Sequence, residues 1–181
     1  MKIESTPLTG VNLITPTVHG DERGFFLETW HADRYTEAGI TLPFVQDNHS
    51  RSRRNTLRGL HFQLDKPQGK LVRVLSGEVF DVAVDLRRSS PTFGRWVGEY
   101  LSSENNKQLW IPPGFAHGFF VTSDTADLAY KCTDYYSTGD DHSLLWSDPN
   151  IGIEWPNHTE EPLISERDRN ASLLEAIPTY P

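Results

Sequence analysis

Apolar and polar residues alternate in short runs through most of the chain, above all between residues 41 and 155. The clearest case is the stretch "KLVRVLSGEVFDVAVDLR", in which alternating runs at 70–75 and 80–86 flank the dipeptide "SG". A β-strand sends successive side chains to opposite faces, so each run predicts a strand. The short connection predicts that the two strands pair as a β-hairpin.

Further runs of this kind are separated by clusters of Gly, Pro, Asn and Asp, which are typical of turns. Many short strands indicate a mainly β fold, either a sandwich or a jelly-roll barrel. Helix is scarce: residues 31–39 predict a short helix that ends at Gly39, and residues 165–177 begin like a helix with Ser165 as its N-cap. Without a repeat or a linker, residues 1–181 are expected to form one domain. The other predicted strands cover residues 44–50, 57–63, 95–101, 108–113, 118–123 and 126–136.

A barrel of this kind encloses an interior, so polar side chains that point inward would gather in one pocket with apolar walls. Strict alternation would send Arg58 and His61 of "LRGLHFQ" to opposite faces, unless Gly59 forms a bulge. A strand histidine alone is more often structural than catalytic, and Lys70 could instead lie at a sheet edge with its ammonium in water. The inward-pointing candidates are Gln46, Asn48, His61, Gln63, Lys70, His117 and Tyr130.

Charge and composition limit the class of protein. The formal net charge of −8 argues against a general nucleic-acid binder. The basic run 51–54, "RSRR", is interpreted as a solvated loop between strands, because no aromatic residues interleave with it. No apolar run reaches the roughly 18 residues of a membrane span, and the N-terminus lacks the layout of a secretory signal. The single cysteine, Cys132, excludes an internal disulfide and suits a cytoplasmic protein.

Two histidines raise the question of a metal site. His117 in "WIPPGFAHGF" lies in a stretch that resembles the second motif of the cupin superfamily, whose metal-binding members usually carry His-x-His in the first motif. Here that motif reads "HFQ", so Gln63 stands in place of an imidazole. A stable zinc or iron site normally needs about three suitable side chains. Because only His61 and His117 are good candidates, we expect no metal.

Eight segments of the chain occur in an order that resembles one known family. They are "DERGFFLETW", "FVQDNHSRS", "LRGLHFQ", "QGKLVRVLSGEVFDVAVDLR", "PTFGRWVGEYLS", "WIPPGFAHGF", "LAYKCTDYY" and "IGIEWP". Together they resemble the dTDP-4-dehydrorhamnose 3,5-epimerase family, which has a cupin-type jelly-roll fold. The resemblance implies epimerisation at C3 and C5 of dTDP-4-dehydro-6-deoxy-D-glucose, in dTDP-rhamnose biosynthesis, without a cofactor. It also implies a homodimer in which N-terminal strands cross to the partner.

The same resemblance assigns the chemistry to four residues. His61 is the base that removes a proton beside the C4 ketone, and Asp168 in "SERDR" is the carboxylate that hydrogen-bonds this histidine. Lys70 would stabilise the enolate oxygen, and Tyr130 would deliver a proton to the opposite face. These roles fit the side chains, since epimerisation needs a base, an oxyanion stabiliser and an acid.

The resemblance further implies contacts with the diphosphate. Guanidinium groups suit phosphate oxygens because their donors form a planar fork. The implied cations are Arg23, Arg58 and Arg167, with His117 close to both the sugar and the phosphate.

Contacts with the nucleoside are implied in the same way. Tyr136 would stack on thymine, and Asp141 lies where many members carry Glu. Three residues from the N-terminal strands would complete the neighbouring subunit's site, namely Arg23, Phe25 and Glu28. The remaining nucleotide contacts are Gln46, Asp47 and Asn48.

Two other functions stay open at this stage. One is a related cupin that acts on a different dTDP-ketosugar, either as an epimerase at one carbon or as a ketoisomerase. The other is a jelly-roll module that binds a nucleotide sugar without turnover, or a metal-dependent cupin.

Overall fold

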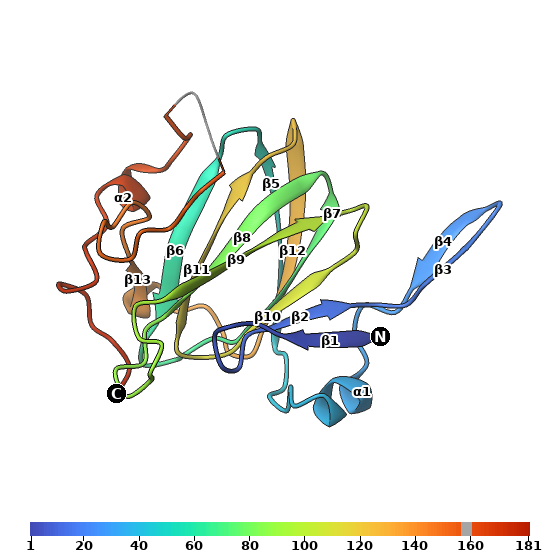
Figure 1. Cartoon of the computed structure of the whole chain (residues 1–181), viewed down its shortest axis with the longest axis horizontal. Helices are drawn as coiled ribbons and strands as arrows, with labels where there is room; N and C mark the ends of the chain where they lie inside the picture. Colours follow the sequence, from blue (N-terminus) through green and yellow to red (C-terminus); the bar gives the residue numbers. More distant parts are fainter. Residues whose placement is uncertain (157–160) are drawn as a thin grey trace.

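The computed structural model describes residues 1–156 and 161–181, and most of its strands form two antiparallel sheets that face each other (Figure 1). In the described residues there are thirteen strands, two short α-helices and one 3-10 helix, η1 (Thr138–Asp140). The larger sheet contains, in spatial order, β1 (Lys2–Ser5), β2 (Asn12–Thr15), β10 (Gln108–Ile111), β7 (Lys70–Ser76), β12 (Thr125–Cys132) and β5 (Gln46–Arg53).

The main core lies between the two sheets. Val72 and Leu128 of the larger sheet, and Ala83 and Phe119 of the smaller, belong to one cluster of buried side chains. Fully burying such a side chain is worth about 1.5–3 kcal/mol, so this layer supplies much of the stability. Two facing antiparallel sheets around one core form a cupin-like jelly roll, which confirms the predicted mainly β fold class. The smaller sheet contains, in spatial order, β13 (Asp141–Ser143), β6 (Leu57–Gln63), β11 (Phe115–Val121), β8 (Glu78–Asp85) and β9 (Trp96–Ser102).

The two strands predicted on either side of "SG" exist as β7 and β8, but the predicted hairpin is wrong. β7 lies between β10 and β12 in the larger sheet, whereas β8 lies between β11 and β9 in the smaller one. Gly77, with φ of +78°, connects them across the sandwich, and a Cβ there would lie 2.0 Å from the Thr125 carbonyl oxygen. Alternation identifies strands that bury a face, but it does not identify the strand with which each one pairs.

The N-terminal region divides into two parts. β1 and β2 extend the larger sheet, whereas β3 (Val18–Asp21) and β4 (Gly24–Leu27) form a separate hairpin that projects away from both sheets (Figure 1). Its apolar side chains are uncovered: Phe25 and Phe26 are 65% and 70% exposed. Helix α1 (Ala32–Glu37) follows and ends before Gly39, whose φ is +89°, as predicted.

The C-terminal segment lies over the outer face of the smaller sheet, where Ile177 packs in a second cluster with Phe62 and Val84. Helix α2 (Glu166–Arg169) begins as predicted, with the Ser165 hydroxyl accepting the Asp168 backbone N–H at 3.1 Å. It is much shorter than the predicted run. The chain after it pairs with other segments, since Leu145 N–H donates to the Ser172 carbonyl at 2.8 Å. No helix in the described residues has both the length and the apolar character needed to cross a membrane.

Most of the basic run 51–54 is not a loop, since residues 51–53 lie in β5 and only Arg54 lies in the turn that follows. Arg51 and Arg53 belong to β5, and the interpretation as a solvated loop is wrong. Asp127 lies opposite Arg51 on β12 and binds its guanidinium at 2.9 Å, while Asp124 binds Arg54 at 2.9 Å. These carboxylates offset the repulsion between the arginines, so the run is compatible with a strand. The predicted strand at 126–136 also ends early, because β12 stops at Cys132.

Candidate active site

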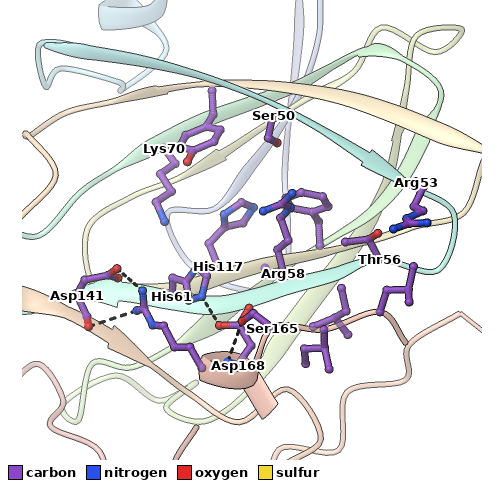
Figure 2. A pocket seen from close by; sticks show the side chains of 17 residues that line it. Ser50, Arg53, Thr56, Arg58, His61, Lys70, His117, Asp141, Ser165 and Asp168 are labelled. Atoms are coloured by element: carbon purple, nitrogen blue, oxygen red, sulfur yellow. Dashed lines mark hydrogen bonds and ion pairs between the residues drawn. The ribbon is translucent and has the colours of Figure 1, made fainter. Parts of the chain in front are cut away.

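A cavity of about 610 Å³ opens between the two sheets and brings most of the predicted site residues together (Figure 2). Its walls come from strands of both sheets, from the segment before α2, and from α2 itself. Apolar walls and a few converging polar groups are typical of small-molecule sites. The predicted residues that line it are Arg58, His61, Lys70, His117, Tyr130, Asp141, Arg167 and Asp168.

The centre of the cavity holds a histidine–carboxylate pair. His61 Nε2 lies 2.6 Å from Asp168 Oδ1, and the Gly59 backbone N–H donates to Asp168 Oδ2 at 3.1 Å. Burial acts to raise the pKa of Asp168, but hydrogen bonds and charge from His61, with further donors from Gly59 and Ser165, lower it overall. The carboxylate is therefore ionised at neutral pH and accepts the Nε2 proton, which leaves Nδ1 as the basic ring nitrogen.

Gly59 explains why Arg58 and His61 share one cavity. His61 is paired with His117, but Arg58 is paired with Phe119, so the ladder between β6 and β11 shifts by one residue. Gly59 has φ of +107°, and a Cβ there would lie 2.6 Å from the His117 carbonyl oxygen. The bulge expected at Gly59 is confirmed, and it turns both side chains toward the cavity.

Lys70 and Tyr130 face His61 from the larger sheet. Lys70 is on β7, a central strand, so the alternative of an edge lysine is wrong. Burial lowers the pKa of Lys70, while nearby Cys132, Asp141 and Asp81 partly oppose this. Burial is also the main cause of the raised pKa of Tyr130, so this phenol keeps its proton at neutral pH. The base candidate and the acid candidate therefore lie on opposite walls of the cavity.

A second histidine–carboxylate pair lies deeper in the site. His117 Nε2 lies 2.9 and 3.0 Å from the two oxygens of Asp81, and Asp81 is fully buried. Sequence reasoning missed Asp81, because alternation on β8 placed it opposite the apolar face formed by Phe80 and Val82. That apolar face is covered by the C-terminal segment, so β8 is buried on both sides and Asp81 points between the sheets.

The expected nucleotide contacts form a smaller cavity of about 190 Å³ that shares His61, Lys70 and Tyr130 with the first. Asn48 accepts a hydrogen bond from the Gln46 amide at 3.0 Å. The Oε1 of the Gln46 side chain in turn accepts the Tyr136 backbone N–H at 2.9 Å.

The other polar residues around this smaller cavity have different positions. The Tyr136 hydroxyl donates to Asp141 at 2.9 Å, which fixes the half-exposed ring. Gln63, another inward candidate, bonds the Tyr135 carbonyl and the Ser137 N–H, so it supports the loop that carries Tyr136. Asp47 differs from its neighbours, since its side chain pairs with Lys131 outside this cavity.

The N-terminal candidates do not reach the cavity of their own chain. Arg23 pairs with Asp21 within the projecting hairpin, and Phe25 is exposed there. Glu28 follows the hairpin and pairs with Arg34 at 2.7 Å. None of Arg23, Phe25 and Glu28 lines either cavity.

Several residues line the larger cavity without having been predicted as site residues, among them Ser50, Arg53 and Thr56. Arg53 was hidden in the run that was interpreted as a solvated loop, and Ser50 lies two residues after Asn48 on the same strand. Period-two spacing from Asn48 was the signal that could have identified Ser50. Among the described residues, no group of three or more His, Cys, Asp or Glu side chains is arranged to hold a metal ion.

Comparison with known proteins places these features in a family. The model of the dTDP-4-dehydrorhamnose 3,5-epimerase family matches residues 5–176. The chain is 51% identical to the dTDP-4-dehydrorhamnose 3,5-epimerase of Pseudomonas aeruginosa, over 100% of both chains. It is 41% identical to a dTDP-4-dehydrorhamnose 3-epimerase of Streptomyces niveus, over 99% of this chain and 90% of that one.

A solved structure gives the same assignment. The dTDP-6-deoxy-D-glucose-3,5-epimerase of Legionella pneumophila, in complex with dTDP-4-keto-L-rhamnose, superimposes with a TM-score of 0.95. It is 54% identical to this chain, and the match covers 98% of this chain and 94% of that one. The chain therefore belongs to the dTDP-4-dehydrorhamnose 3,5-epimerase family.

Proposed function

We propose that this protein is an isomerase that epimerises dTDP-4-dehydro-6-deoxy-D-glucose at C3 and C5, giving dTDP-4-dehydro-L-rhamnose for dTDP-rhamnose biosynthesis. The observation that carries the proposal is the His61–Asp168 pair, which faces Tyr130 across a cavity that also holds Lys70. A base and an acid on opposite walls can take a proton from one face of a sugar ring and return one to the other face.

His61 removes the proton from the substrate. With Nε2–H donated to Asp168, His61 Nδ1 accepts the proton from the carbon beside the C4 carbonyl, and the bonding electrons move to form an enolate. Asp168 then stabilises the imidazolium by charge, as the carboxylate does in a catalytic triad. Because the pair is held by a β-strand and a capped helix, little reorganisation is needed during the reaction.

Two residues of the larger sheet, Lys70 and Tyr130, stabilise the enolate and return the proton. The ammonium of Lys70 donates to the enolate oxygen, and the low polarity around it strengthens that contact. Tyr130 delivers the proton to the opposite face of the same carbon, which inverts it. The His61 imidazolium then releases its proton to water and the Tyr130 phenolate takes one up from water, which restores both groups. Repetition at the second carbon completes the conversion without a net change of protons.

The residues around this catalytic centre bind the rest of the substrate. The Arg58 guanidinium suits the diphosphate, His117 the sugar and phosphate, and Tyr136 the thymine ring. Arg167 is paired with Asp141 at 2.5 Å, so it orders the loop beside Tyr136 as well as contributing charge. The other proposed contacts are Gln46, Asn48 and the Asp47 backbone.

We also propose a homodimer in which Arg23, Phe25 and Glu28 complete the partner's site. An isolated two-stranded hairpin is marginally stable in water, and this one exposes Val18 and Phe26 besides Phe25. A second copy of the chain that packs on the hairpin stabilises it and covers these apolar side chains. The same contact brings the Arg23 guanidinium to a cavity that binds an anion. We further propose a cytoplasmic enzyme, which the free, buried Cys132 suits. We also propose that it binds neither nucleic acid nor membrane, and the net charge of −8 suits the first of these absences.

The direct test of the reaction is incubation with dTDP-4-dehydro-6-deoxy-D-glucose in heavy water, followed by NMR. We expect deuterium at both C3 and C5 of the product. The 3-epimerase relative motivates a second candidate, epimerisation at one carbon. Label confined to one carbon would favour that activity, and a product without label would reject both.

The shared site is tested by mixing two inactive subunits. Arg23→Gln damages the partner's site, whereas His61→Ala damages its own. If Arg23 acts across the dimer, mixed dimers purified through two different tags contain one intact site and recover about half of the wild-type activity. Recovery of no activity would show that Arg23 acts within its own chain, whereas an Arg23→Gln dimer that is fully active by itself would show that Arg23 has no role.

A further inference from the structure

The cations around the cavity differ in whether a carboxylate already neutralises them. Arg167, which lines the cavity, is bound by Asp141 at 2.5 Å. Within the described residues, neither Arg58 nor Arg53 has an ion pair, although both line the larger cavity. Two guanidinium groups without a carboxylate partner in one cavity make its electrostatic potential favour an anion.

Arg53 also differs from its neighbours in the basic run. Arg51 is bound by Asp127 and Arg54 by Asp124, both at 2.9 Å, so these two charges are offset. Arg53 is the last residue of β5, and Figure 2 shows its side chain beside Thr56, at the end of the cavity away from Asp141. The single run therefore contains two arginines that are paired with carboxylates and one that is directed at the cavity.

The connection from β5 to β6 holds Arg53 and Arg58 in one short unit. The Thr56 N–H donates to the Arg53 carbonyl at 3.2 Å, and Asn55 adopts φ of +66°, which gives a tight turn. Arg58 Nε donates to the Ser52 hydroxyl at 3.0 Å, so its guanidinium is oriented before any ligand arrives. A ligand that reaches Arg58 therefore lies close to the turn between β5 and β6, next to Arg53.

A hydroxyl on β5, the strand that also carries Arg53, has no partner within the described part of the chain. The Ser50 Oγ is buried and makes no hydrogen bond within the described residues, yet it lines the cavity (Figure 2). A buried polar atom without a partner is unfavourable, because it has lost its hydrogen bonds to water and gained none in return. A phosphate oxygen accepts hydrogen bonds from both hydroxyl and guanidinium groups, so it would satisfy Ser50 and the two arginines together.

We propose that Arg53 is a further phosphate-binding residue, which acts with Arg58 and the Ser50 hydroxyl on the diphosphate of the nucleotide sugar. This inference rests on the proposed function, since it specifies which cations of this chain bind that substrate. Arg53 contributes to affinity for the anion and takes no part in proton transfer. Its removal therefore raises KM and leaves kcat unchanged.

The test compares Arg53→Gln with Arg54→Gln. Both variants remove one positive charge from an exposed position, but only Arg53 lines the cavity. We expect Arg53→Gln to weaken the binding of dTDP and of inorganic pyrophosphate in calorimetry and to raise KM, each by about tenfold, since charged hydrogen bonds are worth about 1.5–3 kcal/mol. Arg54→Gln should stay within about twofold of the wild type, because exposed ion pairs contribute little. Arg53→Lys should recover part of the affinity.

The outcomes separate this inference from the proposed function. Equal affinities of the Arg53→Gln and Arg54→Gln variants for dTDP and pyrophosphate would overturn the role of Arg53, even if the wild type epimerises the dTDP-sugar. A wild type that binds dTDP through Arg53 but exchanges no substrate protons would uphold the anion site and reject the epimerase. A fall in kcat as large as the rise in KM would also overturn the inference, because it would place Arg53 in the chemical step.

Discussion

Two histidine–aspartate pairs contribute to one cavity, which is lined by His61, Asp168 and His117 but not by the buried Asp81, and their surroundings differ. The His61 side chain is 32% exposed and its carboxylate, Asp168, comes from α2. The His117 side chain is 7% exposed, and its carboxylate, Asp81, comes from the neighbouring strand of the same sheet. The first imidazole has access to a reacting carbon and to exchanging protons, whereas the second is enclosed by the core.

The carboxylates also have different partners. Asp168 accepts from His61 and from the Gly59 N–H, and its own backbone N–H is held by Ser165. Asp81 lies against a single ring nitrogen, His117 Nε2, with both of its oxygens. We therefore propose two purposes for the same two types of side chain: the Asp168 pair moves a proton, and the Asp81 pair holds a binding group in one orientation.

The largest effect that separates the two pairs should follow from His61→Ala. We expect exchange of deuterium to fall by roughly a hundred- to ten-thousandfold at both C3 and C5, because the base is lost. Binding of dTDP, measured by calorimetry, should stay close to that of the wild type. Exchange at wild-type rates in this variant would remove His61 as the base.

A second large effect should follow from Tyr130→Phe, which leaves both histidine pairs intact. Removal of the substrate proton should continue, while delivery to the opposite face slows by roughly a hundredfold or more. Washout of deuterium from labelled substrate would then outpace net product formation, as followed by NMR. If the two rates remain equal, Tyr130 is not the acid.

The two carboxylates can be compared directly by Asp168→Asn and Asp81→Asn. Asp168→Asn should lower kcat by about a hundredfold or more, because the imidazolium loses its counter-charge. Asp81→Asn should raise KM by about five- to tenfold with little change in kcat, because a binding group loses its fixed orientation. Both variants need a check of folding by circular dichroism. A loss of kcat in Asp81→Asn equal to that in Asp168→Asn would abolish the distinction.

This comparison also indicates what the sequence could predict. His61, Lys70 and Tyr130 lie within long motifs that resemble a family, so they were predicted together, and the structure brings them to one cavity; their roles stay predictions. Asp168 is separated from His61 by 107 residues, and no local pattern joins them; only the resemblance did. The fold class followed from period-two alternation, which depends on side chains leaving opposite faces of a strand.

The sequence failed at Asp81, at the connection through Gly77 and in the basic run 51–54. In each case the outcome depends on contacts between residues that are distant in sequence. Residues of β8 do alternate, but both faces of this strand are buried. The assumption that a strand buries only one face therefore failed to place Asp81 in the interior. The connection at Gly77 crosses between sheets, and strand pairing depends on contacts that are distant in sequence. The charges of Arg51 and Arg54 are offset by carboxylates more than 65 residues away, which the local run cannot reveal.

The smallest expected difference between the pairs concerns stability and pH. The pKa of Asp168 lies below its ordinary value in the folded protein, so its ionised form stabilises the fold. That contribution is fully present above the unfolded value, near 3.8, and is lost as the pH falls through the lower folded pKa. Asp168→Asn should therefore lower the thermal midpoint by a few degrees at pH 7, and this deficit should shrink as the pH falls below about 4.

The matched control is Asp124→Asn, which removes an acidic partner from Arg54 on the surface. The Asp124 side chain is 94% exposed, so its ion pair is screened and its loss should leave the midpoint nearly unchanged at any pH. A deficit for Asp168→Asn that stays constant from pH 7 down to pH 3 would show that it comes from packing and neutral hydrogen bonds. The charge of Asp168 would then contribute nothing to the stability of the fold, and its pairing with His61 would have to be explained by catalysis alone.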